Sequence, residues 1–322
     1  MRRNGFLIEE MNETAGFKPN RGRGAQPEIL APGQQPVSGG YAEGYAPNYG
    51  AGYGYDAGEP ASAPQANRPK RLGWASAPAT YTLVGINVLV YLWMCLRGFS
   101  PFAPTSMDLI HSGANAGVLV LGYGQWWRLI TAMFVHVGII HIGVNMWCLW
   151  NLGLLAEPLM GPVGVIAAYL LTGFAGNILS VARHPGVMGG PQSVISAGAS
   201  GAIFGLAGVL IILLRSPLLP IPPLELKKLR RSVIWFAVLN LVLDMGVDAA
   251  HFIVQVDNMA HIGGLLSGVV LGLPMVPRIG SRPEVFRKRR NLAILLVAFL
   301  LLLLTVGVYW YWLGRGSVPG MH

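Results

Sequence analysis

Residues 292–313 read LAILLVAFLLLLLTVGVYWYWL and contain no charged side chain. A helix needs roughly 20 apolar residues to cross the hydrocarbon core of a bilayer, so this stretch predicts a transmembrane helix. It ends on Tyr309, Trp310, Tyr311 and Trp312, and aromatic residues are typical of the level where a membrane meets water. Lipid is therefore the expected solvent for at least this part of the chain.

The composition extends this prediction to most of the chain. Hydrophobic residues make up 53% of the sequence and charged residues only 11%, whereas soluble domains carry about 25% charged residues. Seven apolar segments reach or approach the length of a membrane span: residues 79–96, 130–156, 163–181, 195–214, 233–247, 259–275 and 292–313. We therefore expect an all-α, polytopic membrane protein with six helices followed by a seventh.

Lysine and arginine predict how these helices are oriented. With the N-terminus in the cytoplasm, the cytoplasmic segments hold eight, none, five and six basic residues in chain order, and only four lie outside. Basic residues concentrate on the cytoplasmic side of membrane proteins. We expect the N-terminus inside and the C-terminus outside a cell membrane, a bacterial inner or plasma membrane. This asymmetry explains the net charge of +9, so we expect no nucleic-acid partner.

The chain divides into three parts. Residues 1–72 are rich in Gly, Tyr and Pro without apolar periodicity, which predicts a disordered cytoplasmic tail. Its tyrosines leave two interpretations open, a solvated tail or an interaction segment. Residues 73–277 hold six helices, with an apolar but broken stretch at 97–128 that we expect to lie in the membrane interface. Residues 278–322 form a basic cytoplasmic linker, the seventh helix and a short outer tail.

Polar residues inside membrane helices are costly and often mark function. The second segment contains His136, His141 and Asn145. His141 and Asn145 are four residues apart and share a helix face, whereas His136 and His141 are five apart and would point about 140° away from each other. That spacing differs from a zinc-binding pair, so we expect no metal. The pair of donors fits either an oxyanion site or interhelical hydrogen bonds.

Two further segments carry a serine and a histidine among small residues. Ser200 lies between Gly198 and Gly201 near the start of the fourth segment, where helix N–H groups and the positive end of the helix dipole would favour an oxyanion. His261 precedes Gly264 and Gly268, whose spacing forms a face that allows close approach of a neighbouring helix. Taken singly, each pattern is more typical of helix packing than of a catalytic site.

Together these residues predict a nucleophile, a base and two oxyanion donors. Asp244 is expected at the end of the fifth helix and Asp257 at the outer end of the sixth, so neither is an obvious third member of a triad. We therefore expect a dyad in which His261 takes the proton of Ser200 without an orienting acid. Glu157, just past the second helix, is expected to cap or pair structurally.

Over residues 79–275 the chain resembles the rhomboid intramembrane serine proteases. The resemblance is carried, in order, by Trp127, Arg128, His136, His141, Asn145, Glu157, Gly198, Ser200, Gly201, His261, Gly264 and Gly268.

The resemblance implies that Ser200 and His261 are catalytic. It implies that the oxyanion is held by the side chains of His141 and Asn145 and by the Ser200 backbone N–H. Phe204 stands where many members carry tyrosine beside the catalytic histidine. The family also gives structural roles to His136 and Glu157, and to Trp127 and Arg128 as anchors of the interfacial loop.

The implied reaction is cleavage of single-pass membrane proteins near the outer membrane face, without a cofactor. The implied partners are transmembrane protein substrates and the lipid bilayer. Two other functions remain as alternatives. One is a catalytically silent relative that binds membrane clients, although such proteins typically lack the serine or histidine. The other is a transporter, which would be expected to show more intramembrane charge and inverted-repeat symmetry.

Overall fold

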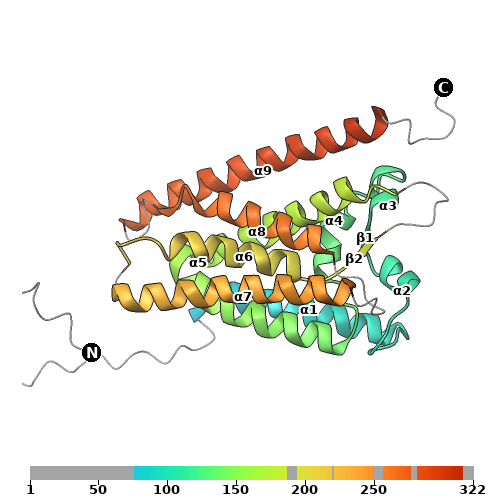
Figure 1. Ribbon diagram of the computed structural model, residues 1–322, viewed down its shortest axis with the longest axis horizontal. Coiled ribbons are helices and arrows are strands. Elements are labelled where there is room, and N and C mark those ends of the chain that lie inside the picture. The colour runs from blue at the N-terminus through green and yellow to red at the C-terminus, as the bar shows by residue number, and fades with distance from the viewer. Residues whose placement is uncertain (1–75, 187–193, 220, 250–256, 277–280, 315–322) are drawn as a thin grey trace, which may run out of the picture. The chain divides into compact units, whose positions relative to one another are not determined.

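The computed structural model describes residues 76–186, 194–219, 221–249, 257–276 and 281–314, and for residues 241–249 only the backbone. The predicted tail (residues 1–72) and the outer tail beyond residue 314 lie outside these ranges. The described residues are mainly helical, as predicted (Figure 1). The long helices are α1 (Pro78–Leu96), α5 (Ile139–Arg183), α6 (Ser200–Leu213), α7 (Pro223–Ala249), α8 (Asn258–Gly272) and α9 (Pro283–Gly314).

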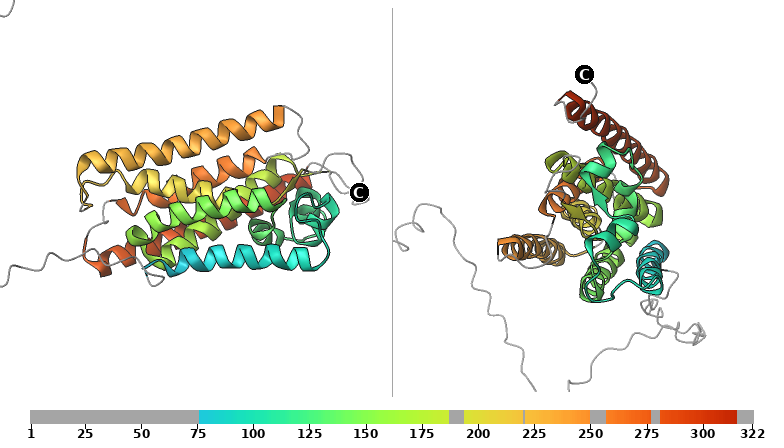
Figure 2. Two further views of the ribbon diagram at one scale, coloured as in Figure 1. Left: turned by 90° about the horizontal axis from the view of Figure 1, so that it is seen from below. Right: turned by 90° about the vertical axis from the view of Figure 1, so that its right-hand side faces the viewer.

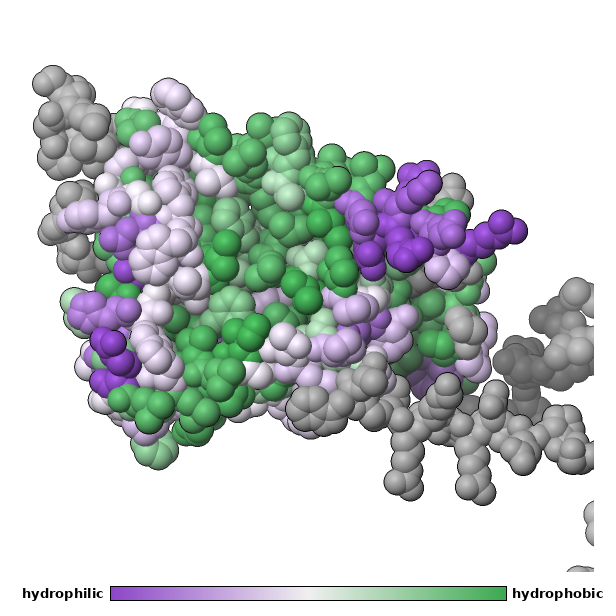
Figure 3. All heavy atoms as spheres, turned by 180° about the vertical axis from the view of Figure 1, so that it is seen from behind, coloured by the Kyte–Doolittle hydropathy of each residue, from purple (hydrophilic) through white to green (hydrophobic). Residues whose placement is uncertain are grey.

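Within these ranges, α1, α5 and α9 are long and apolar enough to cross a membrane, and α6 and α8 are shorter apolar helices. A broad apolar band covers the surface between two ends that carry hydrophilic residues (Figure 3). Exposed apolar surface of this extent is expected where lipid, rather than water, is the neighbour. The structure therefore agrees with a membrane location.

Helix α5 combines the second and third predicted segments, and its boundaries differ from the prediction. It begins at Ile139 rather than at residue 130, and its one non-helical residue is Gly161 at φ +74°, between Pro158 and Pro162. Proline cannot continue the hydrogen-bond ladder, and glycine adopts positive φ without strain. In the second half, Tyr169 donates to the Met133 carbonyl at 3.0 Å. The half after Gly161 thus runs back toward the start of the first half, as a hairpin.

At the end of the molecule where α5 reverses, two charged side chains connect α5 to α1 and α9. The Glu157 carboxylate accepts hydrogen bonds from the backbone N–H groups of Ala79 and Thr80, both at 2.8 Å, and from the Thr80 hydroxyl at 2.6 Å. It therefore caps the first turn of α1, whose N–H groups have no partner within the helix. Arg290 of α9 is buried and donates from Nη1 to the carbonyl of Met160, 3.1 Å away, beside Gly161.

Helices α5, α6 and α8 form the centre of the described fold, and glycines set their spacing. A Cβ added to Gly264 would collide with the carbonyl of Gly201, and one added to Gly268 with the carbonyl of Gly205. On a neighbouring face of α8, a Cβ at Gly263 would lie 2.9 Å from the Cα of Gly176 on α5. The backbones of α6 and α8 are thus in contact along the face predicted from Gly264 and Gly268.

The predicted interfacial stretch folds into short elements at the other end of the molecule. They are α2 (Ser106–His111), β1 (Asn115–Ala116), α3 (Gly117–Leu121), α4 (Arg128–Thr131) and the 3₁₀ helix η2 (Ala132–Phe134). Strand β1 pairs antiparallel with β2 (Ile195–Ser196), with Asn115 opposite Ser196. This two-residue ribbon is a small exception to the all-α prediction. It replaces the start of the fourth predicted helix, so that α6 begins only at Ser200.

The basic segments lie far from this ribbon. Helices α7 and α9 both begin at the end opposite β1 and β2. Figure 1 and the left panel of Figure 2, which show the helices from the side, agree on this. Their first turns carry Lys227, Lys228, Arg230 and Arg231 on α7 and Arg287, Lys288, Arg289 and Arg290 on α9.

Candidate active site

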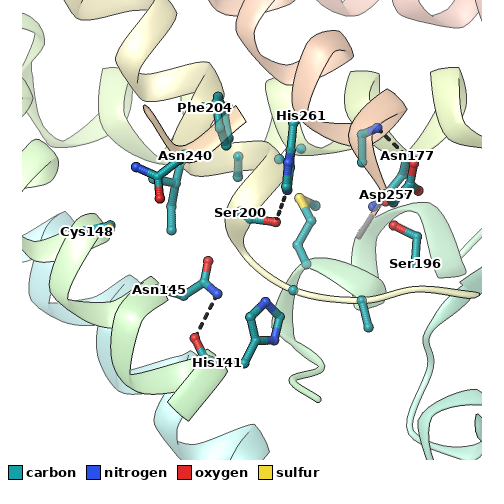
Figure 4. Close-up of a pocket in the computed structure, with 18 of the residues that line it drawn as sticks. His141, Asn145, Cys148, Asn177, Ser196, Ser200, Phe204, Asn240, Asp257 and His261 are labelled. Atoms are coloured by element: carbon teal, nitrogen blue, oxygen red, sulfur yellow. Dashed lines mark hydrogen bonds between the residues drawn. The ribbon is translucent and has the colours of Figure 1, made fainter. Parts of the chain in front are cut away.

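The structure brings Ser200 and His261 together. Ser200 is the first residue of α6 and His261 lies in the first turn of α8, and His261 Nε2 is 2.7 Å from Ser200 Oγ (Figure 4). Gly201 and Gly264 allow this contact, because the two helices touch one turn further along. The distance is that of a hydrogen bond between a hydroxyl and an imidazole nitrogen. The two groups expected to act as nucleophile and base are therefore in direct contact.

Phe204 fixes the plane of the histidine ring. Its own ring lies one turn after Ser200 and stacks on His261, with centroids 4.6 Å apart and an angle of 18° between the planes. Both side chains are buried. The phenyl ring thus supplies an apolar support for the imidazole and offers it no hydrogen bond.

The loop before Ser200 depends on glycine. Gly198 has φ +131°, which side chains other than glycine rarely adopt, and its N–H donates to the carbonyl of Ala132 at 2.9 Å. A Cβ at Gly198 would lie 2.7 Å from Cε1 of His141. The absence of a side chain therefore allows the His141 ring to lie against the loop that carries the nucleophile.

His141 and Asn145 lie on one face of α5 and line the same cavity as Ser200, as their spacing predicted (Figure 4). The Val137 N–H donates to His141 Nδ1 at 3.3 Å, so the proton of the neutral ring is on Nε2. Asn145 donates one amide N–H to the carbonyl of His141 at 2.9 Å. Its second N–H and the Nε2–H of His141 are both donors of the kind that stabilise an oxyanion.

The prediction for His136 is wrong in one respect. His136 lies before α5 rather than on it, and its ring centroid is 5.4 Å from that of His141, so the two rings are neighbours instead of diverging. The helical spacing did not apply because the chain is extended at Val135. His136 is completely buried, and its Nδ1 donates to the carbonyl of Phe134 at 3.2 Å. It lies beside His141 and is not among the described residues that line the cavity of the dyad.

Arg128 and Trp127 lie in the interfacial loop, away from the dyad. The buried Arg128 guanidinium donates from Nη1 to the carbonyls of Ile110 and Ala114, each at 2.8 Å, and from Nε to Gln125 at 2.6 Å. It also lies 4.4 Å from the centre of the Trp127 ring, which is half exposed. These contacts hold the short helices of the loop together.

Ser200, His261, Phe204, His141 and Asn145 line a cavity of about 170 Å³ together with further polar residues that were not predicted to belong to the site. Figure 4 shows them on both sides of the dyad. They are Cys148, Asn177, Ser196, Asn240 and Asp257. Their positions depend on which helices face each other, and a single sequence carries little signal for that.

Asp257 caps α8, and among the described residues its carboxylate makes no hydrogen bond to the His261 ring. Its Oδ1 accepts the N–H of Ala260 at 3.2 Å, which is the usual bond of an N-cap aspartate. This agrees with the expected position of Asp257 at a helix end.

Comparison with known proteins identifies similar sequences. A family model described as "Rhomboid domain" matches residues 123–278. The chain is 32% identical to "Rhomboid protease GluP" of Bacillus subtilis (strain 168) over 242 residues, which is 74% of this chain and 41% of that protein. It is 36% identical to "RHOMBOID-like protein 6, mitochondrial" of Arabidopsis thaliana over 189 residues, 58% of this chain and 56% of that protein.

A third relative, "Rhomboid-like protease 2" of Toxoplasma gondii, is 28% identical over 216 residues, 64% of this chain and 68% of that protein. The matches to the first two relatives span about half of those proteins or less. Two of these three relatives are named as proteases. The family match includes Asn145, Ser200 and His261.

Proposed function

Because this chain belongs to the rhomboid family of membrane proteins, we propose that it is an intramembrane serine endopeptidase in which Ser200 is the nucleophile and His261 the general base. The observation that carries this proposal is the 2.7 Å contact between His261 Nε2 and Ser200 Oγ. Two independent features support it: the Phe204 ring that holds the imidazole plane, and the oxyanion donors on the facing wall of the cavity.

In the first half of the reaction, Ser200 Oγ attacks the scissile carbonyl carbon and its proton passes to His261 Nε2. The C–N bond then breaks, and the same proton goes to the departing nitrogen, which leaves an acyl group on Ser200. In the second half, His261 takes a proton from water as the water oxygen attacks the acyl carbon. The bond between that carbon and Ser200 Oγ then breaks, the product leaves with its new carboxyl group, and the proton returns to Ser200 Oγ. No cofactor is required for either half.

We assign the oxyanion to three donors: the Ser200 backbone N–H, the Nε2–H of His141 and the second amide N–H of Asn145. The first N–H groups of a helix have no partner within it, and Ser200 begins α6. The hydrogen bond from Val137 to His141 Nδ1 keeps the His141 proton on the nitrogen that remains, Nε2. Donors already oriented before the reaction are worth most in a site with little water.

We propose that the substrates are single-pass transmembrane proteins cut near the outer membrane face. The site lies at the ribbon end of the molecule, and the basic starts of α7 and α9 lie at the opposite end, which supports a cytoplasmic position for the latter (Figure 1). The proposed crossings are α1, the two halves of α5, α6, α7, α8 and α9. A substrate helix hides its carbonyls in hydrogen bonds, so it must unwind locally before Ser200 can attack.

The test is cleavage of a single-pass substrate by purified protein in detergent. Wild type should cut it, and Ser200→Ala and His261→Ala should not, with circular dichroism as the control for folding. Asn145→Ala should keep a residual rate, because one oxyanion donor is worth about 3 kcal/mol. Cleavage that survives Ser200→Ala would rule out the mechanism.

The alternative is a family member that binds membrane clients without cutting them. It predicts that wild type and Ser200→Ala capture the same transmembrane proteins and that neither produces fragments. The 2.7 Å contact favours the protease, since client binding alone requires no such contact.

A further inference from the structure

One carboxylate oxygen of Asp257 has no hydrogen-bond donor among the described residues. The residue is only 9% exposed and lines the cavity of the dyad. Its Oδ1 caps α8, but its Oδ2 is buried, and none of the described residues donates a hydrogen bond to it. A buried carboxylate oxygen without a donor is costly. Such an atom at the wall of a substrate cavity points to a ligand that supplies the donor.

The position of Asp257 indicates which part of a substrate would meet it. In the proposed reaction the oxyanion faces His141 and Asn145, while the departing nitrogen faces His261, which protonates it. Asp257 is the N-cap of α8, one turn before His261, and Figure 4 shows it to the right of the dyad, whereas Asn145 lies to the left and His141 below. The substrate residues that follow the scissile bond therefore run past Asp257.

The charge of the cavity indicates which kind of substrate side chain it would bind. Among the described residues that line it, Asp257 is the one acidic side chain, and none is lysine or arginine. Its neighbours on the same side, Asn177 and Ser196, are neutral (Figure 4). The side-chain amide of Asn177 is already bonded to the carbonyl of Leu129 at 2.9 Å. A cationic side chain from the substrate would give Asp257 Oδ2 the donor that the described residues do not supply.

We propose that Asp257 forms a specificity site that accepts a hydrogen bond from a lysine or arginine in the first three substrate residues after the scissile bond. This inference rests on the proposed protease function. It predicts a preference in which lysine is cut faster than leucine, and leucine faster than glutamate, at one of these three positions.

The experiment uses the test substrate of the cleavage assay, with Lys, Leu or Glu placed in turn at each of the three positions. In wild type the lysine substrate should exceed the leucine substrate in kcat/KM by about tenfold at one position, because a hydrogen bond to a charged group is worth about 1.5–3 kcal/mol. In Asp257→Asn this ratio should fall to about one. Asparagine is as good an N-cap as aspartate, so α8 keeps its cap while the charge is lost.

The matched control is Glu225→Gln, which removes an exposed carboxylate paired with Lys228 on α7. It should keep the wild-type ratio. A ratio of one in wild type at all three positions, or an unchanged preference in Asp257→Asn, would overturn the proposal.

Binding provides a second measurement that does not depend on turnover. Ser200→Ala should bind the lysine substrate more tightly than the glutamate substrate, and Ser200→Ala/Asp257→Asn should bind the two equally. The proposal would also be overturned if Ser200→Ala bound the lysine and glutamate substrates equally tightly, as Ser200→Ala/Asp257→Asn is expected to do. If wild type cuts no substrate while this binding difference is present, the proposed protease function fails and the Asp257 site stands.

Discussion

Helices α8 and α9 are both apolar, but α8 packs closely against other helices, whereas α9 exposes most of its surface. Helix α8 presents Gly263 to α5 and Gly264 and Gly268 to α6, at distances where no side chain fits. Helix α9 buries a narrow stripe, Arg290, Ala293, Val297 and Leu301, and exposes most of its leucines. In lipid, apolar side chains gain little by leaving the solvent, so close packing selects the helices that meet. His261, the proposed base, lies on the helix with small residues.

The largest effect expected from this comparison is that of a side chain added to α8. In Gly264→Val the new Cβ would overlap the carbonyl of Gly201, so α6 and α8 must separate and Ser200 must move away from His261. We expect a loss of about 3 kcal/mol in stability and no detectable cleavage. Gly307→Val is the matched control on α9, because a Cβ there meets nothing within 4 Å. Thermal unfolding in detergent measures both, and equal effects would contradict the comparison.

Arg290→Ala tests how α9 is attached. It removes the donor to the Met160 carbonyl at the reversal of α5, and a charged hydrogen bond of this kind is worth about 1.5–3 kcal/mol. We expect a lower midpoint of thermal unfolding and faster proteolysis between α8 and α9. Arg289→Ala, which removes an exposed neighbour, should behave as wild type. Similar proteolysis of the two variants would show that Arg290 is not the anchor.

Phe204→Leu tests the support of the histidine ring. It keeps an apolar side chain but loses the stack on His261, and an aromatic pair is worth about 0.5–1.5 kcal/mol beyond its buried area. We expect kcat to fall by roughly three- to tenfold, with little change in KM. Phe204→Tyr should keep most of the activity. A lower rate in Phe204→Tyr than in Phe204→Leu would show that ring stacking is not what the site requires.

The smallest effect is expected on the lipid-facing side of α9. Leu302 is 60% exposed, so Leu302→Ala removes contacts with lipid or detergent rather than with protein. We expect a change in stability within about 0.5 kcal/mol and an unchanged cleavage rate. A larger loss in thermal unfolding would mean that this face of α9 contacts another protein.

The helical nature of the chain and the residues of the dyad could be predicted from sequence, for different reasons. Apolar length alone identifies segments such as residues 292–313, because lipid imposes it. Ser200 and His261 could be paired because Gly264 and Gly268 lie on the same face as His261, and that face meets α6. Glu157 was expected to pair structurally, but its partners in the first turn of α1 were not identified, since a carboxylate does not specify which N–H groups it caps.

What could not be predicted depends on where helices begin. Residues 130–138 are as apolar as a membrane-spanning helix, but part of this stretch forms the 3₁₀ helix η2, followed by an extended link. This conformation places the ring of His136 beside that of His141. The first residues of the fourth segment pair as β2 with β1, a contact between distant parts of the chain. Asp257 and Asn240 reach the cavity only because of helix packing. Hydropathy records the solvent around a segment and says nothing about such contacts.

The bond between Arg290 and Met160 also bears on the order in which the protein is made. The reversal at Gly161 has no lysine or arginine of its own between the two halves of α5, and the cation beside it comes from a residue 130 positions later in the chain. A ribosome completes the hairpin long before it reaches α9. The contact between Arg290 and the Met160 carbonyl can therefore form only after α9 has been synthesised.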